Sequence, residues 1–291
     1  MQILGHTKIN FIKDQKMSYI ISGIIILIGI VSLVMKGGPN WGIDFTGGTL
    51  VQLKFEKMLD NDKIRIGLGK IGFTNVSIQR FVGSNTVIFK LQESEQVTGD
   101  RMDSLKKNLN TNFVVERIEV VGPAVGLWLI KRTSLAFGLA FLAIIMYVGV
   151  RFKGGIWGVA GVTALVHDIM VVVGVFSLFN KEITLPVVAA ILTIVGYSIN
   201  DTIVIYDRIR ENLRLRYKDE KKLVFNDSIN QTLSRTIITS GTTLITVLSL
   251  YVFGGKVIKD FALVLLLGVL VGTYSSIFIA SPIVYDWKTR K

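Results

Sequence analysis

The sequence predicts a polytopic α-helical membrane protein with six transmembrane helices and one α+β domain between the first and second helices. Half of the 291 residues are hydrophobic, and the mean hydropathy is +0.53. Charged residues make up 19% of the chain, against about 25% in soluble domains. This composition excludes a water-soluble enzyme. Cysteine is absent, which excludes disulfides, cysteine metal sites and thiol catalysis.

Six apolar stretches are long enough to cross a bilayer, which takes about 20 residues. They cover residues 17–35, 133–150, 154–180, 183–206, 236–255 and 261–285. The first follows three lysines, as a signal peptide would, but no alanine precedes Ala124, so an A-x-A cleavage site is missing. We therefore expect residues 17–35 to be a retained anchor.

The distribution of Lys and Arg predicts the orientation. Sixteen of these residues lie in the 1–16 tail, the 151–153 loop, the 207–235 segment and the 286–291 tail, and three lie in the short loops on the other side. Both termini are therefore expected in the cytoplasm. The net charge of +12 follows from this topology, so no nucleic-acid partner is expected. The 207–235 segment alternates charged and apolar residues, which favours amphipathic helices at the membrane surface with a solvated charged face.

This orientation places residues 36–132 outside the cytoplasm. Alternation and helical periodicity predict strands at 49–56, 76–82, 86–92 and 113–121, helices at 60–71 and 97–109, and a hairpin turn at 83–85. The order β-α-β-β-α-β predicts a ferredoxin-like fold. Gly67, Gly69 and Gly72 satisfy the dinucleotide pattern G-x-G-x-x-G, but there a helix precedes the glycines and a strand follows. A glycine-rich helix end is expected instead of a nucleotide site.

Just after the first stretch, residues 41–48 read WGIDFTGG. Gly47 and Gly48 allow a tight turn or a close backbone approach, which favours a connector at the membrane surface. Asp44 lies between two large apolar residues and has no acid, base or nucleophile nearby in the sequence. A catalytic role for Asp44 is therefore not favoured.

Three acidic or basic side chains fall inside the predicted spans: His167, Asp168 and Asp201. A carboxylate at the centre of a membrane helix costs about 2.5–3.5 kcal/mol, so such acids are functional candidates. Asp201 shares a helical face with Ser198, and Asn200 is its neighbour. We expect Asp201 to carry a proton; the alternative is a structural acid that joins helices.

Arg235 opens the fifth stretch and begins a stripe that continues through Thr239, Thr242, Thr246 and Ser249. The stripe is expected to point into the bundle or a water-filled path. Arg235 enters from the side on which Asp201 lies about 7–8 Å deep, so the pair forms the predicted proton relay. A snorkelling anchor is the alternative for Arg235.

His167 and Asp168 point about 100° apart on a helix, and no second intramembrane histidine is present, so a metal site is not expected. Asp168 is expected to act in helix packing or as a second relay acid, with Ser198, Asn200 and Thr239 as further candidates. His167 is more simply a hydrogen-bonded core donor. Gly154, Gly158, Gly161, Gly268 and Gly272 permit close helix packing.

Five motifs together resemble the SecD/SecF family of protein export subunits, which is related to the resistance-nodulation-division transporters. They are 41–48 (WGIDFTGG), 166–168 (VHD), 196–202 (GYSINDT), 206–212 (YDRIREN) and 234–236 (SRT). The resemblance covers essentially the whole chain, and the 196–202 motif is its most specific part. It maps the proton-linked acid of the family onto Asp201 and the family's arginine onto Arg235.

The resemblance implies a non-enzymatic subunit of the bacterial inner membrane that uses the proton-motive force to promote late steps of polypeptide export. The implied partners are a separate SecD chain, the SecYEG channel, YajC as a further candidate, and the exported polypeptide; protons are the coupling ion and no other cofactor is expected. A passive scaffold that only binds emerging polypeptide is the alternative. An intramembrane aspartyl protease is not favoured, because the G-x-G-D motif is missing. A drug exporter would need twelve spans and larger external domains.

Overall fold

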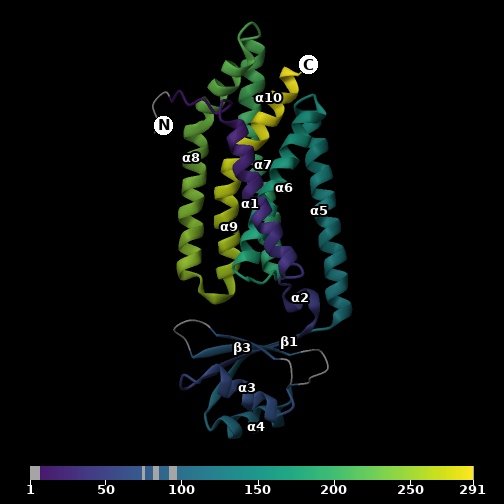
Figure 1. Cartoon of the computed structure of the whole chain (residues 1–291), viewed down its shortest axis with the longest axis vertical. Helices are drawn as coiled ribbons and strands as arrows, with labels where there is room; N and C mark the ends of the chain where they lie inside the picture. Colours follow the sequence, from purple (N-terminus) through teal and green to yellow (C-terminus); the bar gives the residue numbers. More distant parts are fainter. Residues whose placement is uncertain (1–6, 74–75, 81–84, 92–96, 291) are drawn as a thin grey trace. The chain divides into compact units, whose positions relative to one another are not determined.

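The computed structural model describes residues 7–73, 76–80, 85–91 and 97–290. The chain divides into two compact units. One consists of residues 1–40 and 135–291 and is helical; the other consists of residues 41–134 and is built on a β-sheet. Figure 1 shows the long helices of the first unit and the sheet of the second.

In the described part of the chain, six helices are long and apolar enough to cross a membrane, which confirms the six predicted stretches. They are α1 (Gln15–Met35), α5 (Pro123–Arg151), α6 (Gly155–Leu178), α7 (Leu185–Leu215), α8 (Lys221–Phe253) and a sixth that joins α9 (Gly255–Ser275), the π-helical turn η1 (Ser276–Ala280) and α10 (Ser281–Thr289). The 21 residues of α1 suffice for a hydrocarbon core of about 30 Å.

The largest differences between the observed and the predicted helix ends concern α5 and the 207–235 segment. The helix α5 begins at Pro123, ten residues before the predicted start, because Pro is well suited to the first helical turn. The 207–235 segment does not form separate surface helices. It is the end of α7 and the start of α8, and the apolar side chains of Ile209, Phe225 and Ile229 are fully buried in the protein core.

Glycines bring several helices of this unit close together. A Cβ atom added at Gly29 of α1 would lie 2.8 Å from the Gly174 Cα of α6, so neither position has room for a side chain. Hydrogen bonding between the hydroxyls of Ser32 and Ser177 (2.8 Å) joins the same two helices. An added Cβ at Gly272 would lie 2.9 Å from Ser198, which confirms a packing role for this glycine of the last span.

The second unit holds a four-stranded antiparallel sheet in the order β2-β3-β1-β4. Its elements are α2 (Ile43–Thr46), β1 (Gly48–Phe55), α3 (Asn61–Lys70), β2 (Ser77–Arg80), β3 (Thr86–Leu91), α4 (Gly99–Leu109) and β4 (Phe113–Val121). From β1 onwards they follow the predicted order, although residues 81–84, which include most of the predicted hairpin turn, lie outside the described residues. Leu53, Phe89, Ile64 and Leu105 form its core, from both the sheet and the two helices.

The glycines of the G-x-G-x-x-G sequence lie as the element order predicted. Gly67 and Gly69 belong to α3, and Gly72 follows the helix with a φ of +89°, in the left-handed region that favours glycine. Because the helix precedes the glycines, its N-terminus cannot face a pyrophosphate bound at them. The motif is a helix terminus.

Candidate functional site

Asp201 lies inside α7, where its side chain is almost completely buried, with 4% of the residue exposed. Its carboxylate accepts one hydrogen bond that the structure resolves, a long one of 3.4 Å from the Ser240 hydroxyl of α8. The Ser240 hydroxyl also shares a 2.7 Å hydrogen bond with the hydroxyl of Thr273 in α9. Asp201 therefore lies where three helices meet, and its carboxylate is weakly held.

Arg235 of α8 acts electrostatically on the Asp201 carboxylate. The two residues form no ion pair in the part of the chain that the structure describes, and Arg235 is exposed at the surface of the unit. The Thr239 hydroxyl, one turn along, donates to the Arg235 carbonyl oxygen at 2.5 Å. The structure thus brings the two predicted relay residues near each other without joining them.

Asp168 of α6 is buried more completely, with 1% of the residue exposed, and its surroundings differ. Its carboxylate accepts hydrogen bonds from the Ser198 hydroxyl of α7 (2.7 Å) and the Ser275 hydroxyl of α9 (3.0 Å). A third hydrogen bond joins its other oxygen to His167 Nδ1 (3.0 Å). Asp168 therefore ties α6, α7 and the last span together.

The π-helical turn η1 begins beside this cluster. The Ser276 hydroxyl shares a 2.8 Å hydrogen bond with the hydroxyl of Thr202 and approaches the Ser198 carbonyl oxygen (3.4 Å). The widened turn leaves the Ser276 carbonyl oxygen to accept from the Ser281 hydroxyl (2.8 Å). Single π-helical turns inside α-helices are frequent at functional sites, and this one lies against the residue that follows Asp201.

Two further candidate residues do not join this cluster. Asn200 is exposed on α7, and Thr239 is exposed on α8. The hydroxyl stripe that continues from Thr239 through Thr242, Thr246 and Ser249 is also exposed, and each hydroxyl donates to a carbonyl oxygen of its own helix. The stripe does not point into the helix bundle of this chain, so that half of the expectation is wrong, and the alternative of a water-filled path stays a prediction.

Sequence reasoning missed Ser240, Ser275 and Ser276. Each lies in an apolar helix that carries other hydroxyl residues, so spacing alone gave no reason to choose it. The signal that could have found them is the need of a buried carboxylate for donors on the helices packed against it.

The WGIDFTGG motif forms α2 and the start of β1 in the sheet unit. Gly47 and Gly48 have φ angles of +75° and +126°, which other residues rarely adopt. An added Cβ at Gly48 would lie 2.7 Å from the Leu91 carbonyl oxygen, and one at Gly47 would lie 3.1 Å from Pro123. The two glycines are therefore required for packing. Asp44 lies in the first turn of α2 and is partly buried.

Among the described residues, no group of three or more His, Cys, Asp or Glu side chains is arranged to hold a metal ion. The fold and the buried acids define a polytopic membrane protein whose polar chemistry lies inside its helix bundle.

The chain belongs to the SecD/SecF family. Residues 101–290 match the family model "Protein export membrane protein SecD/SecF, C-terminal", and residues 31–57 match the "SecD/SecF GG Motif". The protein translocase subunit SecF of Calditerrivibrio nitroreducens is 43% identical over 99% of this chain and 97% of its own length. The SecF of Escherichia coli O157:H7 is 40% identical over 96% and 88%. These names describe a role in transport rather than in catalysis.

A solved structure has the same fold. The crystal structure of SecDF, a translocon-associated membrane protein from Thermus thermophilus, is 38% identical and superposes with a TM-score of 0.87. It covers 98% of this chain, and this chain covers 39% of it. The present chain thus corresponds to about two fifths of that longer protein.

Proposed function

We propose that this chain is a proton-coupled subunit of the bacterial Sec export machinery. It works with SecD in the inner membrane and uses the proton-motive force to promote late steps of polypeptide translocation. The observation that carries the proposal is the difference between the two buried carboxylates. Asp168 has three hydrogen-bond partners, whereas Asp201 has one distant donor and an exposed arginine that acts on it electrostatically.

This difference supports Asp201 as the carrier of the exchangeable proton. Each donor stabilises the charged form of a carboxylate, so the three partners of Asp168 favour a structural role for it. A buried carboxylate with one weak donor is costly when it is charged. Whether the Arg235 guanidinium lies close to the Asp201 carboxylate therefore decides whether that carboxylate is protonated. Asp201 takes up a proton from the outer side and releases it to the cytoplasm, with Arg235 stabilising the charged form.

The available energy suits such a cycle. One charge that crosses 100 mV yields about 2.3 kcal/mol, and a typical allosteric coupling free energy is about 1–3 kcal/mol. The change of charge on Asp201 would alter how α8 packs on α7 and α9, since Ser240 contacts both Asp201 and Thr273.

The exposed stripe on α8 supports a partner within the membrane. Arg235 and the stripe hydroxyls lie on a helix whose apolar window is 17% buried in this chain. A cation faces lipid poorly, and SecD is the partner that would cover Arg235 and the stripe beside it. This chain matches 39% of the SecDF relative. This supports the proposal that another chain, SecD, supplies the remaining part of the membrane bundle. The SecYEG channel, YajC and the exported polypeptide complete the proposed set of partners.

The sheet unit is the proposed contact for emerging polypeptide. We assign it a ferredoxin-like fold outside the cytoplasm, because two helices and the strand order β2-β3-β1-β4 follow the β-α-β-β-α-β pattern. Both chain termini then face the cytoplasm, in accord with the distribution of Lys and Arg. Protons are the only coupling species that this function needs.

The test is export into inverted membrane vesicles from a strain depleted of this subunit, with and without a proton gradient. Adding back the Asp201→Asn variant should restore assembly with SecD but not the gradient-stimulated part of export. Asp207→Asn, six residues further along the same helix and partly exposed, is the matched control and should export like the wild type. If Asp201→Asn exports normally under a gradient, the chain is a passive scaffold and Asp201 is structural.

A further inference from the structure

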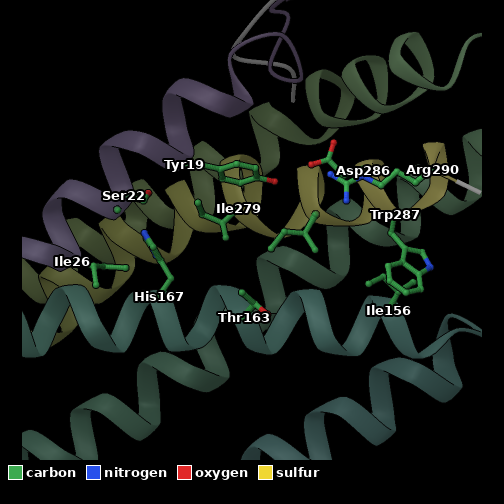
Figure 2. Close-up of a pocket in the computed structure, with 12 residues that line it drawn as sticks. Tyr19, Ser22, Ile26, Ile156, Thr163, His167, Ile279, Asp286, Trp287 and Arg290 are labelled. Atoms are coloured by element: carbon green, nitrogen blue, oxygen red, sulfur yellow. The ribbon is translucent and has the colours of Figure 1, made fainter.

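The helical unit contains a groove that the proposed proton relay does not use. It lies between α1, α6 and the η1–α10 part of the last span, and its volume is about 510 Å³. This lies within the range of about 300–1,000 Å³ typical of ligand sites. Figure 2 shows residues from these three elements facing one another across the groove. Neither Asp201 nor Arg235 lines it.

The inner part of the groove is apolar in effect. The Thr163 hydroxyl donates to the Val159 carbonyl oxygen (2.9 Å), and the Ser22 hydroxyl is hydrogen-bonded to the Tyr274 hydroxyl (3.1 Å). These polar groups therefore need no ligand. Ile26, Ile279 and Ile283 supply branched aliphatic side chains to the groove, and Ile156 lies beside Trp287 at the other end. His167 also lines the inner part, and its Nδ1 is hydrogen-bonded to Asp168 at 3.0 Å.

The other end of the groove is polar and aromatic. The Tyr19 hydroxyl is buried and has no hydrogen-bond partner among the described residues. Asp286 accepts a hydrogen bond from the Gln15 side chain (3.0 Å). Trp287 is 49% exposed, and Arg290 extends back across the same end toward Asp286 in Figure 2.

We propose that this groove binds one anionic phospholipid, with its phosphate at Arg290 and an acyl chain along the isoleucine wall. Lys16 lies one turn before Tyr19 on α1 and is exposed, outside the residues that line the groove. The Tyr19 hydroxyl gains an acceptor among the phosphate or ester oxygens. Trp287 lies where aromatic side chains anchor at the membrane interface.

The location suits this ligand. In the orientation proposed above, on which this inference rests, the end of the groove with Arg290 faces the cytoplasmic leaflet, which is rich in anionic lipid. Basic pockets between membrane helices on that side bind anionic head groups. An acyl chain matches the inner wall in length and polarity better than a water-soluble ligand would.

The test is native mass spectrometry of the purified full-length chain in mild detergent, with added phosphatidylglycerol or phosphatidylcholine. We expect one phosphatidylglycerol to be retained in preference to phosphatidylcholine. Arg290→Gln removes one cation and should weaken retention about fivefold. Gly23 lines the groove and an added Cβ there meets nothing within 4 Å, so Gly23→Leu should narrow the groove and reduce retention.

Two variants serve as matched controls. Gly138→Leu adds the same side chain to α5, where an added Cβ also meets nothing within 4 Å. Lys218→Gln removes an exposed cation from the turn between α7 and α8. Both should bind phosphatidylglycerol like the wild type, and so should Asp201→Asn, which separates this inference from the proton relay.

Three results would overturn the lipid assignment. They are equal retention of the two lipids, retention that neither Arg290→Gln nor Gly23→Leu reduces, and loss of phosphatidylglycerol when the chain is bound to SecD. The last result would mean that a protein helix occupies the groove.

Discussion

Replacing Asp168 by Ala is expected to destabilise the helical unit strongly, and the structure gives the size of the effect. Truncation removes the acceptor of three donors. The Ser275 hydroxyl keeps a second acceptor, the Gly272 carbonyl oxygen at 3.2 Å, whereas Ser198 and His167 lose the carboxylate partner that the structure shows for them. At about 1–3 kcal/mol for each buried group left unsatisfied, the loss is about 2–6 kcal/mol.

Asp201→Ala is the matched comparison, because it truncates the same residue type in a neighbouring helix. It removes a single hydrogen bond of 3.4 Å, and Ser240 keeps Thr273 as its partner at 2.7 Å. The expected loss is below about 1.5 kcal/mol. Thermal unfolding in detergent measures the stability of both variants, when the fraction of protein that remains monodisperse is followed with temperature. Equal melting temperatures for the two variants would refute the division into a structural and an exchangeable acid.

Two glycine substitutions test the packing of each unit. Gly48→Ala should destabilise the sheet unit by about 1–3 kcal/mol, because Gly48 has a positive φ and the new Cβ would lie 2.7 Å from the Leu91 carbonyl oxygen. Limited proteolysis of the full chain measures this loss of stability. Gly69→Ala is the control: a Cβ there meets nothing within 4 Å, so this variant should not be cleaved faster than the wild type. Gly29→Leu should separate α1 from α6, since a Cβ there would lie 2.8 Å from the Gly174 Cα. A melting temperature equal to that of the wild type would contradict that close contact.

The strands and membrane spans could be predicted where the apolar residues follow one periodicity along the sequence. The strand 113–121 was predicted with the bounds that β4 has, because its residues keep a β-branched pattern between two turn signals. The start of α5 was missed because Lys131 and Arg132 lower the local hydropathy although the backbone stays helical. Hydropathy reports where a helix meets lipid, and the helix itself continues beyond that point.

The extent of α7 and α8 was missed for a related reason. Residues such as Ile209 and Phe225 form a narrow apolar stripe among charges, which is also the pattern of a helix lying on a membrane surface. In the structure this stripe packs on the rest of the bundle. Periodicity shows that a face is apolar and does not show whether lipid or protein covers it.

The candidate site shows the same limit. Sequence placed Asp168 and Asp201 in the membrane, because charged residues there are rare. It did not distinguish their roles, since the donors Ser198, Ser275 and Ser240 come from other helices or from a different turn. The number of donors around each carboxylate is a property of tertiary packing.

These contacts also indicate which helix can move when Asp201 changes its charge. The Asp168 hydrogen bonds join α6, α7 and the last span at 2.7–3.0 Å. At the turn between α7 and α8, the Asn212 side chain donates to the Ser228 hydroxyl at 2.8 Å. Near Asp201, α8 is joined to α9 by the Ser240–Thr273 hydrogen bond (2.7 Å) and to α7 by the Tyr197–Thr243 bond (3.2 Å), and its bond to Asp201 itself is the longest, at 3.4 Å. The helix α8 is therefore expected to pivot about its turn with α7.

Spin labels on paired cysteines can measure this movement, because the chain has no native cysteine. Val166 of α6, Thr193 of α7 and Ile245 of α8 are exposed positions where a label causes little disturbance. Asp201→Asn imitates the protonated acid, so it should change the distance between labels at Val166 and Ile245. The distance between Val166 and Thr193 should stay constant, since hydrogen bonds to Asp168 hold α6 and α7 together. A change in both distances, or in neither, would show that the charge of Asp201 does not act through α8.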